Sequence, residues 1–211
     1  IGIALCNKGY KNSDEILRDA DAAMYQAKSL GRGRYVFFDD SMREKLIATM
    51  TLEQELRIAI EQEQFELHYQ KISDLDSSKV IGFEALLRWN HPNNGLLTPS
   101  EFLHLAEETG IILLIETWVV EEVSRQLQSW HNEIDYQHAF IAINLSGRHL
   151  TQANQLNKLI SLIHQQAFEP QRLILEFNES AFCEHADVAL KGLRKLKGAG
   201  VKLALDDYAS G

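Results

Sequence analysis

Oxygen-bearing side chains stand at or near the ends of several short apolar runs in this sequence. They are Glu84 in Val80–Trp89, Asn144 in Ala139–Ser146, Glu176 in Leu173–Asn178, and the adjacent Asp206 and Asp207 after Val201–Leu205. If these runs are parallel strands, the side chains meet at one edge of a sheet. So many anionic oxygens stay ionised together only around a divalent cation. The pattern therefore predicts a metal site.

The composition describes an acidic globular chain. Its 211 residues are 45% hydrophobic and carry a formal net charge of -9, enough apolar material for one sizeable core or for two modules. The negative charge disfavours nonspecific binding to DNA or to an anionic membrane, because it repels phosphate. We therefore expect no DNA partner. We also expect that any anionic substrate is held by local Arg or Lys side chains or by a metal ion.

The cysteines and the apolar stretches indicate the compartment. Cys6 and Cys183 are too few and too far apart to suggest a disulfide framework, and no charged leader with an apolar segment opens the chain. The apolar stretch Ile111–Val120 is interrupted by Glu116 and is far shorter than the roughly 20 residues of a membrane span. We expect a cytoplasmic protein whose chain here contains no membrane span. A membrane anchor in a further segment of the full-length protein is compatible with this expectation.

The first part of the sequence predicts a small α/β unit over residues 1–40. We expect strands at Gly2–Leu5 and Arg34–Phe38 around a helix at Ser13–Leu30, in which Asn12 and Glu15 have the spacing of a capping box. A long polar helix follows, capped by the residues 39–41 and running to about Glu63. Its composition is typical of a connector, so we assign residues 41–63 to a connecting helix.

From residue 64 onward, apolar runs of strand length alternate with helical patterns. The expected strands are Phe65–Ile72, Val80–Trp89, Ala139–Ser146, Arg172–Asn178 and Val201–Asp206; the expected helices are two within Pro99–Trp130, then Thr151–Gln166 and Asp187–Lys197. This alternation favours an α/β fold with a mainly parallel sheet and outer helices, as in a barrel or a doubly wound fold. A complete (β/α) barrel has eight strands and typically about 250 residues. We therefore expect residues 64–211 to be the N-terminal part of an incomplete TIM-like barrel.

The run Gly82-Phe83-Glu84-Ala85-Leu86-Leu87-Arg88-Trp89 resembles the signature of EAL domains, which are cyclic-di-GMP phosphodiesterases. Glu-Ala-Leu alone is weak, but an ordered series of further motifs matches from about residue 50 to the end. These motifs are Tyr69-Gln70, Phe102, Ala106-Glu107-Glu108-Thr109-Gly110, Asn144-Leu145-Ser146, Glu176-Phe177-Asn178-Glu179-Ser180 and Asp206-Asp207-Tyr208-Ala209-Ser210-Gly211.

The opening segment is similar to the end of a GGDEF (diguanylate cyclase) domain. The resemblance rests on Ala20-Asp21-Ala22-Ala23-Met24-Tyr25-Gln26-Ala27-Lys28 followed by Gly31-Arg32-Gly33-Arg34-Tyr35. The catalytic motif of that family is absent from the sequence, so we do not expect this remnant to synthesise cyclic-di-GMP.

The EAL resemblance implies the roles of the site residues. Glu84, Asn144, Glu176 and Asp206 are the implied ligands of one Mg²⁺ or Mn²⁺, with Asp207 helping to hold a second ion, and an all-oxygen set suits such hard cations. Two ions activate a water for in-line attack on a phosphodiester, which makes Glu84, Asp206 and Asp207 the implied catalytic residues and linear pGpG the product. Gln70 and Arg88 are the implied substrate-binding residues. The family also implies a homodimer formed through this domain.

Several positions depart from the family pattern. Lys71 replaces a proline, Asn178 replaces a threonine, and Asp-Asp-Tyr-Ala-Ser-Gly replaces Asp-Asp-Phe-Gly-Thr-Gly, while the implied metal ligands are retained. An active phosphodiesterase, a catalytically weak cyclic-di-GMP receptor and an inactive fragment therefore stay open, and an enolase-like barrel is a less favoured reading. The family's general base is expected beyond Gly211, so this piece alone is not expected to turn over substrate.

Overall fold

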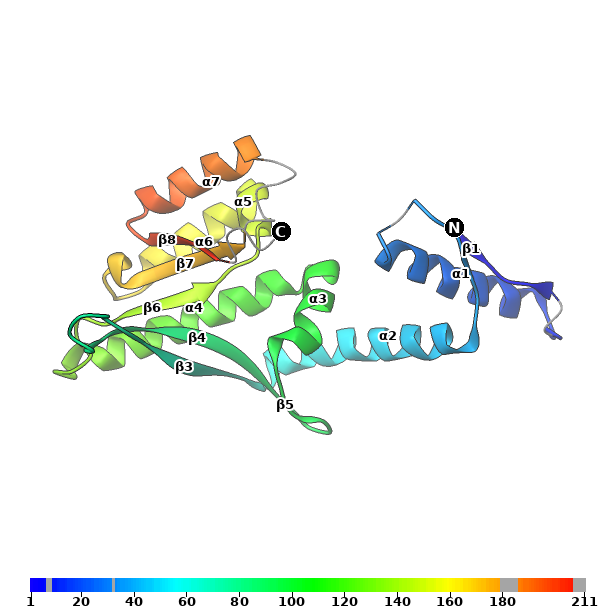
Figure 1. Ribbon diagram of the computed structural model, residues 1–211, viewed down its shortest axis with the longest axis horizontal. Coiled ribbons are helices and arrows are strands. Elements are labelled where there is room, and N and C mark those ends of the chain that lie inside the picture. Colours follow the sequence, from blue (N-terminus) through cyan, green and yellow to red (C-terminus); the bar gives the residue numbers. More distant parts are fainter. Residues whose placement is uncertain (7–8, 32, 179–185, 207–211) are drawn as a thin grey trace. The chain divides into compact units, whose positions relative to one another are not determined.

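The computed structural model describes residues 1–6, 9–31, 33–178 and 186–206, and the chain forms two compact units. The first unit covers Ile1–Glu55 and the second covers Leu56–Gly211. The division falls within helix α2, which runs from Asp40 to Glu61. Figure 1 labels the helices and strands of both units, and each unit is described by itself.

The first unit has the elements that its sequence predicts, with shorter strands. Strand β1 (Gly2–Ile3) pairs in parallel with β2 (Val36–Phe37), and α1 (Ser13–Ser29) lies between them in the sequence. At the start of α1, the Asn12 side chain accepts the Glu15 N–H at 2.9 Å. The Glu15 carboxylate accepts the N–H of Lys11, and not that of Asn12 as an ideal capping box requires.

A buried ion pair fixes α1 to the first turn of α2. The Asp19 carboxylate is 1% exposed and accepts three hydrogen bonds from the Arg43 guanidinium, at 3.1, 2.6 and 2.6 Å. The same guanidinium lies over the Phe38 ring at 5.3 Å from its centroid. Phe38 packs with Ala22 and Ala23 in the small core of this unit.

The second unit is built on a mixed sheet with the strand order β3-β4-β6-β7-β8, and β5 pairs with β4 at its outer end. The strands are β3 (Phe65–Ser73), β4 (Val80–His91), β5 (Gly95–Leu97), β6 (Phe140–Asn144), β7 (Leu173–Asn178) and β8 (Lys202–Asp206). Strands β4, β6, β7 and β8 are mutually parallel, whereas β3 and β5 are antiparallel to β4. The mainly parallel sheet expected from the sequence is confirmed.

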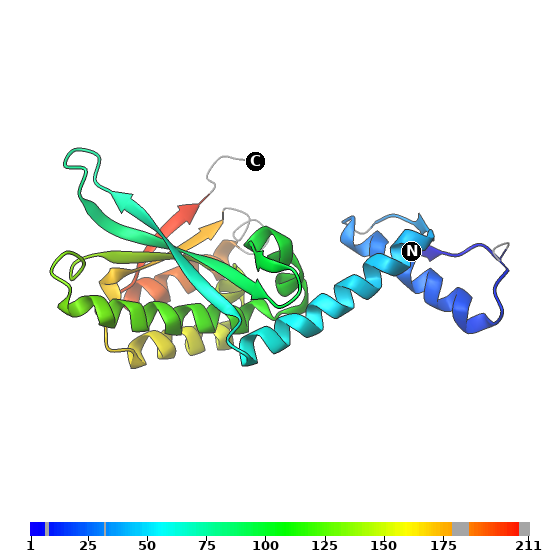
Figure 2. The same cartoon turned by 90° about the horizontal axis from the view of Figure 1, so that it is seen from below.

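The main helices lie along one face of this sheet (Figures 1 and 2). They are α3 (Pro99–Thr109), α4 (Ile112–Ser129), α6 (Ala153–Gln165) and α7 (Ala186–Gly198), with short helical segments at η2 (Trp130–Asn132), α5 (Arg148–Thr151) and η3 (Pro170–Arg172). Glu101 accepts the Thr98 N–H at 2.7 Å at the start of α3, and Gly110 ends that helix with a positive φ of 79°.

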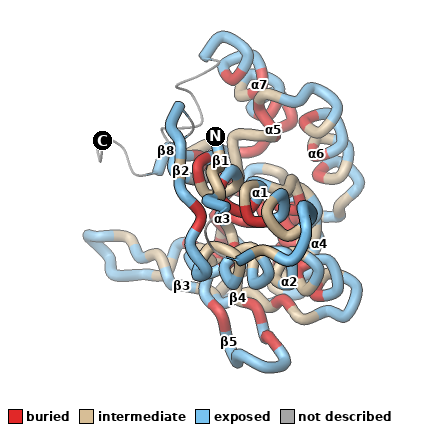
Figure 3. Tube along the Cα trace, turned by 90° about the vertical axis from the view of Figure 1, so that its right-hand side faces the viewer, coloured by how far each residue is buried: buried red, intermediate tan, exposed pale blue. Residues whose placement is uncertain are grey.

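The alternation of burial along the strands shows which face holds the core. In β7, Leu173, Leu175 and Phe177 are buried, whereas Ile174 and Glu176 are partly exposed. Period-two burial means that one face of the sheet packs against the helices and the other carries the remaining side chains. The turn between β3 and β4 is exposed, as Figure 3 shows.

Besides the single-turn segments η2 and η3, two elements of the second unit were not expected from the sequence. Strand β5 follows the turn at residues 92–94, and α5 is separated from the end of β6 by the three residues 145–147. Both are too short, at three and four residues, to show a periodic pattern. None of the helices in the described part of the chain combines the length and the apolar character needed to cross a bilayer.

Candidate functional site

The register of the parallel strands places the predicted ligands on one face at one edge of the sheet. Glu84 pairs with Ala142, so Asn144 lies two residues further along β6 on the same face. Asn144 in turn pairs with Glu176 of β7. Glu176 pairs with Ala204, which puts Asp206 on that face two residues further along β8.

A direct contact joins two of these side chains. Nδ2 of Asn144 donates a hydrogen bond to Oε1 of Glu84 at 2.9 Å. On the other side of Asn144, the backbone N–H of Leu145 donates to the carbonyl oxygen of Glu176 at 2.9 Å and extends the β6–β7 pairing by one residue. The end of β6 is therefore tied to both neighbouring strands.

The electrostatics of Glu176 show that the carboxylates influence one another. Burial raises the pKa of its carboxyl above the ordinary value, and the negative charges of Glu84 and Asp206 raise it further. Each of these causes disfavours the ionised form of the group. A cation at this edge would act in the opposite direction and favour ionisation.

The two predicted substrate-binding residues lie on the same face of the sheet. Gln70 of β3 is directly opposite Glu84 in the antiparallel pair. Arg88 is four residues beyond Glu84, about 13 Å further along β4 at the usual rise of a strand, and its Nη1 donates to the Leu87 carbonyl at 2.7 Å. Gln70 thus lies beside Glu84 on the neighbouring strand β3, and Arg88 lies further along β4 itself.

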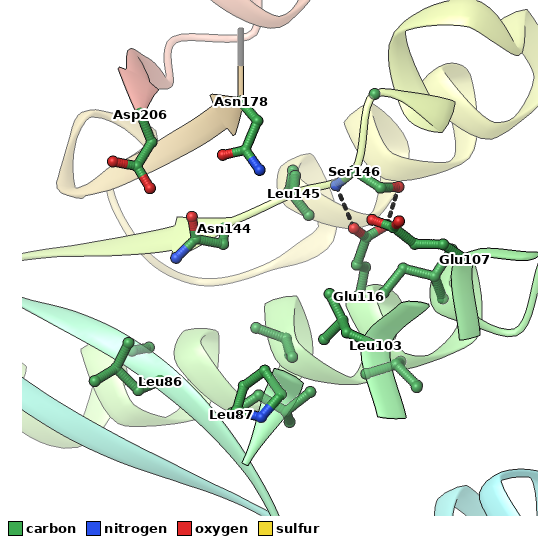
Figure 4. Close-up of a pocket in the computed structure, with 16 residues that line it drawn as sticks. Leu86, Leu87, Leu103, Glu107, Glu116, Asn144, Leu145, Ser146, Asn178 and Asp206 are labelled. Carbon is green, nitrogen blue, oxygen red and sulfur yellow. Dashed lines mark hydrogen bonds between the residues drawn. The ribbon is translucent and has the colours of Figure 1, made fainter. Parts of the chain in front are cut away.

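A cavity of about 280 Å³ opens beside this edge, as Figure 4 shows. Asn144, Asn178 and Asp206 line one part of it, and Glu107 and Glu116 line another. Apolar side chains from β4, α3 and α4 complete its wall. Burial raises the pKa of the Glu107 carboxyl, and the charge of Glu116 adds to this effect.

The structure thus brings Gln70, Glu84, Asn144, Glu176 and Asp206 to one face, as the sequence predicts. Asp207 lies outside the described residues. In the part of the chain that is described, no three His, Cys, Asp or Glu side chains are grouped closely enough to hold a metal ion as they stand. The ligand set predicted from the sequence is wider than such a group, because it also includes the side-chain amide of Asn144 and the carboxylate of Asp207, which is not among the described residues.

Sequence reasoning missed three residues near this edge. Asn178 pairs with Asp206 and lines the cavity, although in the sequence it stands out only as a departure from a family motif. Glu116 and Ser146 contact each other within the cavity wall. The available signal for Glu116 was a charged residue inside an otherwise apolar helical stretch.

Comparison with protein families decides the assignment, because the model described as "EAL domain" matches residues 53–211. The chain belongs to the EAL-domain family. The match covers the whole second unit, including every strand of the sheet that carries the predicted site.

Curated relatives of this EAL-domain chain include signalling proteins of known name. It is 41% identical over 213 residues to "Bifunctional diguanylate cyclase/cyclic di-GMP phosphodiesterase MucR" of Pseudomonas aeruginosa, a match covering 100% of this chain and 31% of MucR. It is 34% identical over 213 residues to "Cyclic di-GMP phosphodiesterase PdeR" of Escherichia coli, covering 100% of this chain and 32% of PdeR. The chain thus spans about a third of the length of these relatives.

Solved structures confirm the EAL-type α/β fold. The structure "PaMucR Phosphodiesterase, c-di-GMP complex" matches with a TM-score of 0.71 and 39% identity, covering 76% of this chain and 65% of that chain. "Crystal Structure of EAL domain Protein from Listeria monocytogenes EGD-e" matches with a TM-score of 0.63 and 25% identity, covering 75% and 61%. The expectation of an EAL-type α/β fold is therefore correct.

Proposed function

We propose that the protein containing this chain hydrolyses cyclic-di-GMP to linear pGpG at the edge where β4, β6, β7 and β8 end. The observation that supports this most strongly is the register, which places Glu84, Asn144, Glu176 and Asp206 on one face in a chain of the EAL family. The names of MucR and PdeR give the same activity for related proteins.

The residues at this edge fit a site for Mg²⁺ or Mn²⁺, and we propose two ions. Their donors are carboxylate and amide oxygens, which hard divalent cations prefer. Burial and the charges of Glu84 and Asp206 raise the pKa of Glu176, and a divalent cation bound among these oxygens would offset that repulsion. Glu84, Asn144, Glu176 and Asp206 would hold one ion, and Asp207 would help to hold the second.

The protein side chains then bind and orient the dinucleotide. When bound, the ions lower the pKa of a water and offset charge on the phosphodiester. The Arg88 guanidinium is suited to hold the non-bridging phosphate oxygens, because its planar fork matches their geometry. Gln70, across the sheet from Glu84, contacts the ligand from β3. The Asn144 amide now donates to Glu84, and a half-turn about its Cβ–Cγ bond presents its oxygen to a cation instead.

The remaining assignments are proposals about the whole protein. Residues 1–40 are proposed to be the end of a GGDEF domain, residues 41–63 the connecting helix and residues 64–211 the N-terminal part of the EAL domain. The matches to MucR and PdeR cover the full length of this chain, including its first unit, which supports the same order of domains. We also propose a cytoplasmic location and a homodimer formed through the EAL domain.

Product analysis of the intact protein tests this function. Incubation with cyclic-di-GMP and Mg²⁺ or Mn²⁺ is expected to release pGpG, and EDTA is expected to abolish release. Glu84→Gln should remove activity, whereas Glu121→Gln should not, because Glu121 is an exposed glutamate of α4. Tight binding of cyclic-di-GMP without release of pGpG would instead identify a receptor.

A further inference from the structure

A buried carboxylate on α4 stands beside the proposed site but belongs to none of its predicted groups. Glu116 is 4% exposed and sits in the helix among Ile115, Val119 and Val120, which are also buried. A carboxylate in such surroundings is costly unless hydrogen bonds or charges compensate it. The partners of Glu116 therefore indicate why the residue is there.

Among the described residues, the hydrogen-bond and ion-pair partners of this carboxylate lie in the segment that follows β6. Oε1 accepts the backbone N–H of Ser146, and Oε2 accepts the Ser146 hydroxyl at 3.2 Å (Figure 4). Nε2 of His149, a residue 2% exposed, lies 2.9 Å from Oε2. Glu116 thus holds a turn of the chain that is 30 residues away in the sequence.

This turn begins two residues after Asn144. The chain passes from Asn144, whose amide contacts Glu84 at 2.9 Å, through Leu145, whose N–H is bound to the Glu176 carbonyl, to Ser146. The backbone of Leu145 and Ser146 is therefore fixed on two sides, by β7 and by the carboxylate on α4. Without the carboxylate, the backbone N–H of Ser146 would lose its partner on α4, and the end of β6 would keep only its contacts with β4 and β7.

We propose that Glu116 is a positioning residue for the phosphodiesterase site: its carboxylate, acting through the Ser146 N–H, fixes the end of β6 so that the Asn144 side chain is held beside Glu84. This inference rests on the proposed function. Glu116 itself does not reach the ligands, and its effect passes through the backbone. A group that orients a ligand in this way typically contributes 10- to 100-fold to metal affinity or activity.

The charge of Glu116 also acts on a neighbouring carboxyl. Glu107 lines the same cavity, and its pKa is raised by burial and then by the charge of Glu116. The variants must therefore separate the charge of Glu116 from its hydrogen bond.

Substitutions at Glu116 and Ser146 make this separation. Glu116→Gln keeps an oxygen that accepts the Ser146 N–H but removes the charge, whereas Glu116→Ala removes both. Ser146→Ala removes only the hydroxyl and leaves the backbone N–H in place. Glu121→Ala is the matched control, because Glu121 is exposed on the same helix.

The test measures kcat and KM for cyclic-di-GMP, thermal stability, and hydrogen exchange of peptides covering residues 140–150, all in the intact protein. Glu116→Ala is expected to lower kcat by about 10- to 100-fold with little change in KM, and to speed exchange at residues 145–147. Glu116→Gln and Ser146→Ala are each expected to retain most of the wild-type kcat and of the protection from hydrogen exchange. Glu121→Ala is expected to match the wild type in both.

The outcomes separate this inference from the proposed function. An active wild type with an unchanged kcat in Glu116→Ala overturns the inference and leaves the function standing. Equal losses of kcat in Glu116→Ala and Glu116→Gln, in proportion to their losses of thermal stability, also overturn it, because the role would then be structural only. If the wild type releases no pGpG, the proposed function fails, and the inference is then tested by hydrogen exchange at residues 145–147. Faster exchange in Glu116→Ala, but not in the other variants, supports the inference. Unchanged exchange in Glu116→Ala overturns it.

Discussion

The close packing of β4 against β6 makes Gly82 a sensitive probe of the site. Gly82 pairs with Phe140 in the parallel register, two residues before Glu84. A Cβ atom added at Gly82 would lie 2.6 Å from three atoms of the Phe140 ring. Real Cβ atoms do not come that close, so in Gly82→Ala either the Phe140 ring turns away or β4 moves away from β6.

The expected size of this effect is the difference of two contributions. Overpacking of this kind costs about 1–3 kcal/mol, while replacing glycine by alanine stabilises by about 0.4–1 kcal/mol through the unfolded chain, so the middle values of the two ranges leave a net loss of about 1.3 kcal/mol. The unfolding transition of the EAL domain, followed by tryptophan fluorescence in denaturant, measures this loss. A movement of β4 would separate Glu84 from Asn144 and reduce pGpG release, whereas a turn of the ring alone would leave release unchanged.

Two further variants make the reasoning refutable. Phe140→Ala removes the ring that the new methyl group meets, so the double variant should show a favourable coupling of at least about 0.5 kcal/mol. Gly198→Ala, where an added Cβ meets nothing within 4 Å, should not lose stability. The packing argument fails if Gly82→Ala is as stable as the wild type, or if the two substitutions at Gly82 and Phe140 are simply additive.

The remaining predictions concern titrating groups and substrate binding. The pKa of Glu176 is raised by burial and then by the charges of Glu84 and Asp206, so its contribution to stability without metal is fully present below pH 4.5 and is lost as the pH rises through the folded pKa. In EDTA, the free energy of unfolding measured with denaturant should therefore decline above pH 4.5, and Glu176→Gln or added Mn²⁺ should reduce this decline. If neither changes the dependence of the unfolding free energy on pH, the prediction is contradicted. For Asp19, burial is the largest single influence and acts to raise the pKa, but the hydrogen bonds from Arg43, the contribution of Tyr10 and the positive charges of Arg43 and Arg18 together outweigh it, so the pKa is lowered. Its contribution is thus present above pH 3.8 and lost as the pH falls through the folded pKa, and Asp19→Asn should cost the first unit about 1–3 kcal/mol at pH 7, as measured by denaturant unfolding. Arg88→Lys should raise the KM for cyclic-di-GMP, since lysine lacks the bidentate fork, and an unchanged KM would argue against phosphate binding there.

Much of the second unit could be predicted because its strands are marked by local pattern. The apolar runs around Glu84, Asn144 and Glu176 have strand length and alternate with helical patterns, and this order implies parallel neighbours. Once the strands are parallel, the shared edge of their carboxyl ends follows from geometry. The site's main residues were therefore accessible from spacing and motif alone.

The parts that could not be predicted depend on contacts between distant segments or on very short elements. Strand β5 and helix α5 are shorter than one period of any hydrophobic pattern. The partners of the buried Glu116 carboxylate are Ser146 and His149, which no local rule places near it. The half-satisfied capping box at Asn12 and Glu15 likewise follows from the path of the chain before α1.

Direct measurement of Mn²⁺ binding tests the central claim that this edge of the sheet is a divalent metal site. Titration of the intact protein with Mn²⁺, followed by the electron paramagnetic resonance signal of the free ion, should show tight binding to the wild type and to Glu121→Gln. Binding should be strongly weakened in Glu176→Gln and in Asn144→Ala. Equal binding by all four proteins, or no binding by the wild type, would contradict the account.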